Sequence, residues 1–152
     1  MRQRRQVPRR TLVTDARTVI DSCVGTNLRL ATRLVTRFLD ARLRTAGLTL
    51  AQFGLLAHIA AAGDDTIGAL AARSGLDQTT LSRNLRGLES DGLIEITLVE
   101  SDLRRRAVWL TETGARRLAA AIPVWRRAQA SLARSVDPHE ARALAARAAA
   151  LA

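Results

Sequence analysis

Residues 76–94 read LDQTTLSRNLRGLESDGLI, and this segment limits the fold more than any other part of the chain. Asp77 is a favourable cap because its carboxylate can accept the free backbone N–H groups of a helix that starts after it. Leu81, Leu85 and Leu88 recur at three- and four-residue steps, which places them on one apolar stripe. Gly92 suits the left-handed residue that ends a helix. The segment therefore predicts an amphipathic helix with one buried face.

A shorter helix is predicted just before this segment. Thr66 is a suitable N-cap, Leu70 points inward at helical spacing, and Gly75 closes the helix. A short helix, a tight turn with glycine and a second helix are typical of a helix-turn-helix.

Two β-prone runs follow the second helix. Leu93–Val99 and Arg106–Leu110 flank a polar tip, so they predict a hairpin. A helix that fills the major groove of DNA, beside a basic hairpin tip that reaches the minor groove, is an arrangement suited to reading a duplex.

Helical periodicity also fills the rest of the chain. Residues 15–46 predict one long helix, with Gly25 breaking or bending its first turn and Gly47 ending it. Thr49 caps a second helix that ends near Gly63.

Two further helices are predicted after the hairpin. Thr111 begins a long alanine-rich helix, in which Pro123 predicts a kink or a joint. Asp137 precedes a last helix that has Pro138 at its first position.

These elements predict a mainly α fold with a small β-hairpin wing. Residues 1–13, with five arginines in the first ten positions, are expected to be a flexible basic arm. Residues 14–152 are expected to form a single domain, in which 49–110 are a winged helix-turn-helix. The helices of 14–46 and 111–152 carry more apolar surface than that small core can cover, so they predict a homodimer.

The charge of the chain points to a polyanionic partner. The formal net charge is +10, the pI is about 11.7, and all 24 basic residues are arginine. A strongly basic domain usually binds nucleic acid. The low aromatic content of 3% argues against single-stranded RNA, which needs stacking platforms.

Other function classes find little support. Neither catalytic motifs nor a set of zinc ligands is present, so we expect no enzyme, no metal and no cofactor. One cysteine excludes an intrachain disulfide and suits the cytoplasm, where the protein would associate with the nucleoid. No apolar run of eighteen residues predicts a membrane span.

The candidate DNA-binding residues lie on the helix of residues 78–90 and at the hairpin tip. Arginine can pair with guanine and glutamine with adenine, while hydroxyls reach phosphates or a thymine methyl. Asp102 can hold the guanidinium of Arg104 extended, as a narrow minor groove requires. Arg105 and Arg106 are expected to alternate sides of the strand, so at most one shares the face of Arg104. The set is Gln78, Thr79, Ser82, Arg83, Arg86, Asp102, Arg104, Arg105 and Arg106.

On these residues the chain resembles the MarR (multiple antibiotic resistance regulator) family of winged-helix regulators. The resemblance runs from about Asn27 to Ala130 and is carried by TLAQFGLL, by IGALAARSGLDQTTLSRNLRGLESDGLI and by DLRRRAVWLTETG. It implies a homodimer that offers one winged helix to each half of a palindromic operator. It also implies that Arg104 enters the minor groove with Asp102 orienting it, and that Arg106 occupies an often basic position.

The resemblance further implies a repressor that responds to a signal. Many relatives bind a small aromatic or phenolic compound between the dimer helices and the winged helix, and Arg37, Phe53 and His58 are the candidate lining residues here. Some relatives sense peroxides through a cysteine near Cys23, but they use tyrosines, and this chain has no Tyr. A packed cysteine and a core histidine are the plain alternatives for Cys23 and His58.

Three other functions fit parts of the pattern. A sequence-tolerant architectural DNA-binding protein would share the charge but lack a base-reading face. A cysteine-based redox regulator would share the fold but depend on Cys23. An adaptor that has lost DNA binding is disfavoured by the Asp102 and Arg104 pair.

Overall fold

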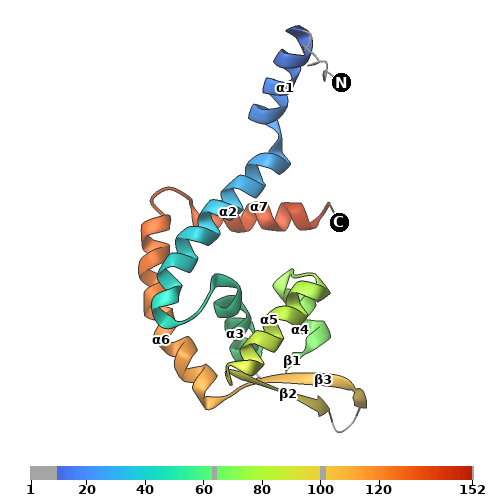
Figure 1. The fold of residues 1–152 in the computed structure, drawn as a ribbon, viewed down its shortest axis with the longest axis vertical. Coiled ribbons are helices and arrows are strands. Elements are labelled where there is room, and N and C mark those ends of the chain that lie inside the picture. The colour runs from blue at the N-terminus through green and yellow to red at the C-terminus, as the bar shows by residue number, and fades with distance from the viewer. Residues whose placement is uncertain (1–9, 63–64, 100–101, 152) are drawn as a thin grey trace, which may run out of the picture. The chain divides into compact units, whose positions relative to one another are not determined.

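A computed structural model describes residues 10–62, 65–99 and 102–151, and excludes the side chains of Asp65 and of residues 98–105. The chain divides into two compact units, residues 1–38 and 39–152. Figure 1 shows the element order from the N-terminus in blue to the C-terminus in red.

The first unit consists of helices. Helix α1 spans Arg10–Ser22, and α2 spans Val24–Leu43 and continues into the second unit. The single helix predicted over 15–46 is therefore interrupted, and the interruption lies at Cys23 rather than at Gly25. Gly25 is instead accommodated in the first turn of α2, where no atom lies within 4 Å of its β-carbon position.

The start of α1 corrects the predicted arm. Residues 10–13 were expected to be flexible, but they form the first turn of α1. RTLVTDARTVIDS contains neither glycine nor proline, the two residues that oppose a helix most strongly. Residues 1–9 lie outside the described part of the chain.

The second unit contains the winged helix. After α2 a short 3₁₀ helix, η1 (Arg44–Ala46), ends at Gly47, which has φ of 72°. Helix α3 spans Leu50–Ala62, α4 spans Ile67–Ser74 and α5 spans Gln78–Ser90. Thr49 Oγ1 accepts from the Gln52 N–H at 3.2 Å, and the Gln52 side chain accepts from the Thr49 N–H at 2.9 Å. This reciprocal capping confirms Thr49 as the start of α3.

A three-stranded antiparallel sheet follows, in the order β1-β3-β2. Strands β2 (Ile94–Val99) and β3 (Asp102–Leu110) form the predicted hairpin, with β3 four residues longer at its start than expected. Strand β1 (Asp65–Thr66) pairs with Val108 and Ala107. It was not predicted, because two residues carry no alternation pattern.

The core of the second unit is built from leucines. Leu81, Leu85 and Leu88 of α5 are each at most 2% exposed, as their spacing predicts. They pack in one cluster with residues from α3, α4, the sheet and α6. The other large members are Leu43, Leu48, Phe53, Leu55, Leu56, Ile59, Leu70, Leu93, Ile94, Val108 and Leu118. This cluster positions α5 with one face in the core and the opposite face free.

Two helices complete the chain. Helix α6 spans Glu112–Leu132 and runs through Pro123 as one helix, so the chain has no joint at this proline. Helix α7 spans Pro138–Ala149, and Asp137 caps it by accepting from the His139 N–H at 2.8 Å. Within the described residues no single helix is long and apolar enough to cross a membrane; only the bent pair Val24–Ala46 and Leu50–Ala62 meets the length and composition criteria.

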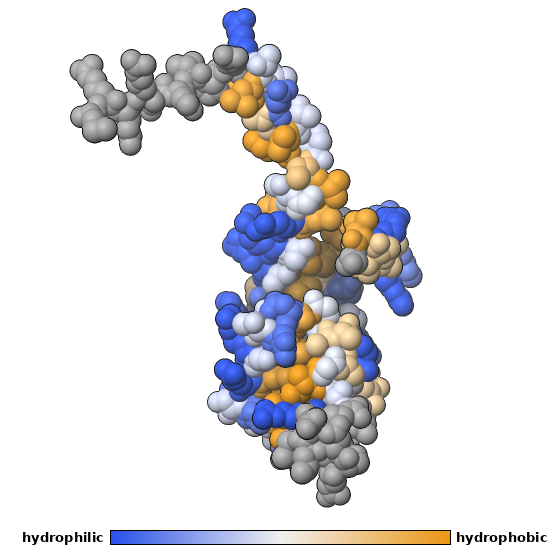
Figure 2. All heavy atoms as spheres, turned by 90° about the vertical axis from the view of Figure 1, so that its right-hand side faces the viewer, coloured by the Kyte–Doolittle hydropathy of each residue, from blue (hydrophilic) through white to orange (hydrophobic). Residues whose placement is uncertain are grey.

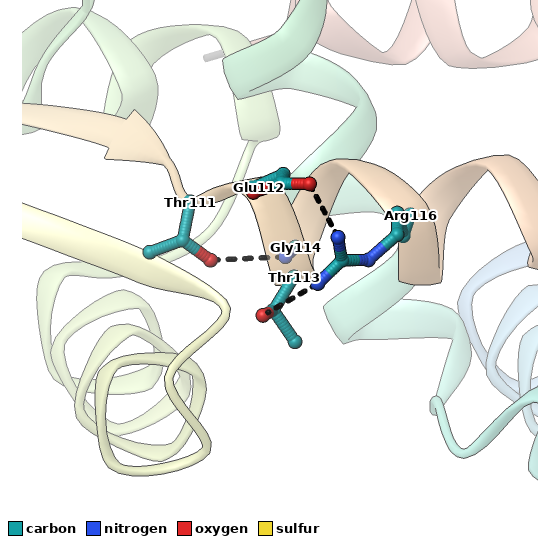
Figure 3. Close-up of polar contacts among 5 residues, drawn as sticks. All are labelled: Thr111, Glu112, Thr113, Gly114 and Arg116. Atoms are coloured by element: carbon teal, nitrogen blue, oxygen red, sulfur yellow. Dashed lines mark hydrogen bonds and ion pairs between the residues drawn. The ribbon is translucent and has the colours of Figure 1, made fainter.

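The wing and α6 meet at a tight junction, and Figure 3 shows its contact between Thr111 and Gly114. Thr111 Oγ1 accepts from the Gly114 N–H at 2.9 Å and donates to the Gly92 carbonyl at 2.7 Å. The Thr111 N–H donates to the Leu93 carbonyl at 3.2 Å. A β-carbon at Gly114 would lie 1.9 Å from that carbonyl oxygen, so only glycine fits here. In the LTETG motif, Thr111 is thus explained by its hydrogen bonds and Gly114 by the close approach of the backbone.

We predict that Gly114→Ala will destabilise the fold by about 3 kcal/mol, because backbone atoms of Leu93 and α6 must separate. Gly54→Ala is the matched control, since Gly54 lies inside α3 with no atom near its β-carbon position. That substitution should stabilise by about 0.5–1 kcal/mol through helix propensity. Urea unfolding followed by circular dichroism measures both; equal effects of the two variants would contradict this account of the junction.

Candidate nucleic-acid interface

The start of α5 is held by a chain of hydrogen bonds. Asp77 accepts from the Thr80 N–H at 2.9 Å and from the Thr80 hydroxyl at 2.7 Å. The Asn84 amide then donates to the Thr80 carbonyl at 2.9 Å. These contacts lower the pKa of Asp77, chiefly through the Thr80 hydroxyl and then through backbone N–H groups. Since the cap is charged and bonded twice, the first turns of α5 are well fixed.

Opposite the leucine stripe, α5 presents a polar surface that we call the α5 face, made of Gln78, Thr79, Ser82, Arg83 and Arg86. These five residues line one shallow hollow of about 460 Å³. All are exposed except Ser82, which is partly buried. The structure therefore brings together the five helix residues that the sequence singled out.

The chemistry of the α5 face suits the edges of base pairs. It combines two guanidinium groups, one amide and two hydroxyls on a rigid helix, and it contains no carboxylate. Guanidinium groups pair bidentately with guanine, and an amide pairs with adenine. A helix of this size enters the major groove, so the face can both read bases and contact phosphates.

The hairpin reaches away from α5 as the wing (Figure 1). Its pairing is regular from Ile94 with Leu110 to Leu98 with Arg106, and the next pair is Val99 with Asp102. Residues 103–105 thus lie between two consecutive pairs. The alternation expected for Arg105 and Arg106 stays a prediction, because the side chain of Arg105 lies outside the described residues.

Among the wing residues with described side chains, Arg106 is the predicted DNA contact. It is exposed and lines a hollow of about 300 Å³ with Glu89, Ile96 and Thr97. By register it shares a strand face with Val108, which is buried in the core. Arg106 is therefore turned toward the side that α5 covers. The side chains of Asp102, Arg104 and Arg105 lie outside the described part of the structure.

Glu89 was not singled out from the sequence. It lies in the last turn of α5 and lines the same hollow as Arg106. A carboxylate near a helix C-terminus is unfavourable unless a cation lies nearby, and this pattern is a signal that the sequence already carried.

The residues predicted to line a ligand pocket have different surroundings. Phe53 is buried in the core, and its ring stacks on Trp125 with centroids 5.9 Å apart. His58 lies on α3 and is partly exposed. Arg37 is an exposed residue of the first unit. The pocket they were predicted to form stays a prediction.

Trp109 is a residue of β3. It is 39% exposed, and its indole N–H donates to the Thr97 hydroxyl at 3.2 Å. The ring therefore lies along the outer face of the sheet, opposite Glu95 in the ladder.

Cys23 lies at the break between α1 and α2 and is partly buried. The Thr26 hydroxyl, followed by backbone N–H groups of Thr26 and Gly25, lowers the pKa of the Cys23 thiol below its usual value of 9.0. The sulfur thus occupies the N-cap position of α2, which favours the thiolate. Within the described residues, no group of three or more His, Cys, Asp or Glu side chains is placed to hold a metal ion.

Comparison with known proteins agrees with this geometry. The sequence model of the MarR family matches residues 46–105. One match is the crystal structure of the Mycobacterium tuberculosis transcriptional regulator MosR in complex with DNA. Its sequence is 36% identical to this chain, the match covers 86% of this chain and 96% of MosR, and the TM-score is 0.78. The chain belongs to the MarR family.

More distant MarR structures share the fold. A mutant of MarR from E. coli, complexed with operator DNA, is 24% identical over 88% of this chain and 96% of that one, with a TM-score of 0.74. The repressor CouR, bound to a 23-mer DNA duplex, is 25% identical over 88% of this chain and 94% of that one, with a TM-score of 0.74. A comparison with curated proteins found no match to this chain.

Membership of the MarR family gives the general function. The chain is a DNA-binding transcriptional regulator with a winged helix, and homodimers are typical of MarR proteins. MarR regulators are generally not enzymes. The α5 face is the described surface that fits this role.

We predict that Asp77 makes the stability of this MarR protein depend on pH in the acid range. The pKa of Asp77 is lowered in the folded chain, while an unfolded aspartate titrates near about 3.9. The unfolded chain therefore binds more protons as the pH falls through this range, so the stabilisation is complete above about pH 5 and is lost below it.

Asp77→Asn keeps a capping oxygen and removes the charge. It should therefore abolish this part of the pH dependence, with only a small loss of folding stability at pH 7. Thr80→Val should weaken the pH dependence because it removes the main cause of the lowered pKa. Thermal unfolding between about pH 7 and about pH 2.5 measures each variant across the range in which the carboxylate titrates. If the melting temperatures of the wild type and of Asp77→Asn depend on pH in the same way, this role of Asp77 is ruled out.

Proposed function

We propose that this protein is a homodimeric repressor that binds a palindromic operator and is released by a small ligand. The observation that carries the proposal is the α5 face, in which five polar residues without a carboxylate line one hollow on a capped helix. The MosR structure at 36% identity was solved in complex with DNA, which supports DNA binding by this chain.

Exposed apolar residues support the homodimer. Within the described residues of α1 and α2, several large aliphatic side chains are more than 40% exposed, and Figure 2 shows apolar surface along these helices. They are Leu12, Val19, Ile20, Val24, Leu30 and Leu34. Such a row of apolar residues is costly in water unless a partner covers it. A second copy related by a two-fold axis would cover it and double the DNA contacts.

The wing completes the proposed DNA contact. Arg104 would enter the minor groove with Asp102 orienting it, and Arg105 and Arg106 would add positive charge beside it. Two wings and two α5 helices would then contact half-sites about 34–36 Å apart. The protein would act in the cytoplasm on chromosomal DNA.

The proposed release from DNA by a ligand depends on the spacing of the two half-sites. A ligand that changes the separation of the two α5 helices would weaken binding to a fixed operator, because both half-sites must be met at once. The regulator BpsR from Bordetella bronchiseptica, whose DNA binding is described as regulated by 6-hydroxynicotinic acid, is a structural relative at 21% identity. For this chain we propose a small organic acid of that general kind.

Selection from a random duplex library at about 150 mM salt tests the function, because charge-driven binding is already screened at this ionic strength. We predict that an inverted repeat will be enriched, with half-sites about one helical turn apart. Binding without an enriched sequence would instead support a sequence-tolerant architectural protein, since charge alone gives unspecific binding.

Three variants then locate the contacts. Arg83→Ala should cost about 1–3 kcal/mol and relax the preference at one operator position, and Arg104→Ala should lower operator affinity while the dimer stays intact. Arg44→Ala is the control, because it removes the same charge from η1, away from α5 and the wing. If all three variants lose the same affinity on every sequence, the base-reading role of Arg83 is wrong.

Redox sensing by Cys23 is the second candidate function. It is favoured by one observation, the lowered pKa of the thiol beside Thr26. The thiolate is the form that oxidants attack, so a lowered pKa increases reactivity at neutral pH.

We predict that the rate of Cys23 alkylation by iodoacetamide will rise with pH around a midpoint below that of a free cysteine. Thr26→Val should move the midpoint up, because the Thr26 hydroxyl is the largest cause of the lowered pKa. Thr32→Val, further along α2, is the control. A wild-type midpoint at or above 9.0, the ordinary value for the thiol, would remove the observation that favours redox sensing.

A further inference from the structure

The hollow beside the wing contains a charged pair that the proposed DNA contact does not use. It has a volume of about 300 Å³ and is lined by Glu89, Ile96, Thr97 and Arg106. All four residues belong to the second unit, so the hollow lies within one compact body. It brings together a carboxylate from the last turn of α5 and a guanidinium group from β3.

Glu89 lies at the edge of the polar side of α5. It follows Arg86 by three residues and Ser82 by seven, and residues at these spacings share one side of a helix. The hollow of the α5 face includes Arg86 but not Glu89, and the hollow beside the wing includes Glu89 but not Arg86. Glu89 therefore adds a negative charge next to a face whose charged groups are all cations.

Arg106 is the cation that shares a hollow with Glu89. Its strand face is turned toward the side that α5 covers, as the register with Val108 shows. Both side chains are exposed, and Glu89 forms no ion pair with any side chain that the structure describes. Because an arginine side chain has many rotamers, the guanidinium group can turn either to this carboxylate or to an anion in solution.

Helix stability does not account for a glutamate at this position. The last turn of α5 contains no basic residue, and Asp91 follows as the C-cap. Two carboxylates at this end oppose the partial negative charge of the helix C-terminus. Glu89 thus costs some stability within α5, and the guanidinium group of Arg106 is the opposite charge that faces it from the wing.

A DNA strand crosses this hollow in the proposed complex. With α5 in the major groove and the wing tip in the adjacent minor groove, the sugar–phosphate backbone between the two grooves must pass between α5 and the wing. Phosphates on this path attract Arg106 and repel Glu89. The two side chains therefore act in opposite directions on the same stretch of backbone.

We propose that Glu89 competes with DNA phosphate for Arg106 and so limits the affinity of this protein for DNA of any sequence. In the free protein the carboxylate attracts the guanidinium group across the hollow, and a phosphate must replace this attraction before the contact gains free energy. Binding driven by charge alone is weakened in this way, whereas the base contacts of the α5 face are not. The inference rests on the proposed DNA contact of α5 and the wing.

The test measures binding of the full-length protein to a non-operator duplex by fluorescence anisotropy at several salt concentrations. At about 100 mM salt, Glu89→Gln should bind about three- to tenfold more tightly than the wild type, because the competing charge is gone. The plot of log affinity against log salt should also become steeper by up to about one, since one more phosphate is neutralised.

Glu95→Gln is the matched control. Glu95 is an exposed glutamate of the wing, but it lies opposite Trp109 on the outer face of the sheet and does not line the hollow. Removal of this charge should change the affinity by less than about twofold, because it leaves Arg106 without a new contact. Circular dichroism checks that each variant is folded.

A double-mutant cycle identifies the partner of Glu89. Arg106→Gln should weaken binding by itself, because it removes a phosphate contact. In that background Glu89→Gln should change the affinity by less than about twofold, since no guanidinium group remains to compete for. Arg86→Gln is the comparison background, in which Glu89→Gln should keep its full effect.

Three results would overturn the proposal. They are an unchanged or weaker affinity of Glu89→Gln, an equal gain in Glu95→Gln, and a full gain of Glu89→Gln in the Arg106→Gln background. The last result would mean plain repulsion of phosphate without competition.

Selection of an operator is scored separately from this cycle. If Glu89 and Arg106 are coupled on non-operator DNA but the wild type selects no operator, the inference stands and the repressor function fails. If the wild type selects an inverted repeat but Glu89→Gln changes nothing, the repressor function stands and the inference fails.

Discussion

The approach of α6 to the Leu93 carbonyl is the contact on which the rest of the winged helix depends. That carbonyl accepts from the Thr111 N–H and leaves no room for a β-carbon at position 114. Thr111 adds two hydrogen bonds, one to Gly92 and one to Gly114, so the end of α5, the start of β2 and the start of α6 are joined within a few residues. Because backbone groups make this junction, it has little freedom to adjust, and the orientation of α5 is fixed relative to α6.

A second connection lies at the opposite corner of the winged helix. There, the Asp40 carboxylate of α2 caps α3 through Leu50, and Arg117 of α6 binds the Gly47 carbonyl. Unlike the first junction, this corner is held by side chains, which can change rotamer at low cost. The winged helix is thus attached rigidly at one end and adjustably at the other.

The sequence predicted the elements that depend on local patterns. The leucine spacing of α5 and the caps at Thr49, Thr66 and Asp77 require only neighbouring residues, and the structure confirms them. The sequence did not predict β1, which exists only through pairing with β3. It predicted a helix break at Gly25, whereas the break lies at Cys23. The five residues of the α5 face followed from helical periodicity. The shift in register on the wing did not, because pairing between strands is decided by tertiary contacts.

The positive charge of the α5 face comes from guanidinium groups alone. Arginine cannot be deprotonated in proteins, and Arg83 and Arg86 are the cations of this face. The chain also contains no lysine, so acetylation of side-chain amines has no target on this surface or elsewhere in the chain. Neither acidity nor that modification can weaken the attraction between this face and phosphate. A change in the charge of this face would therefore have to add negative charge, for example at the Thr79 or Ser82 hydroxyl, rather than remove positive charge.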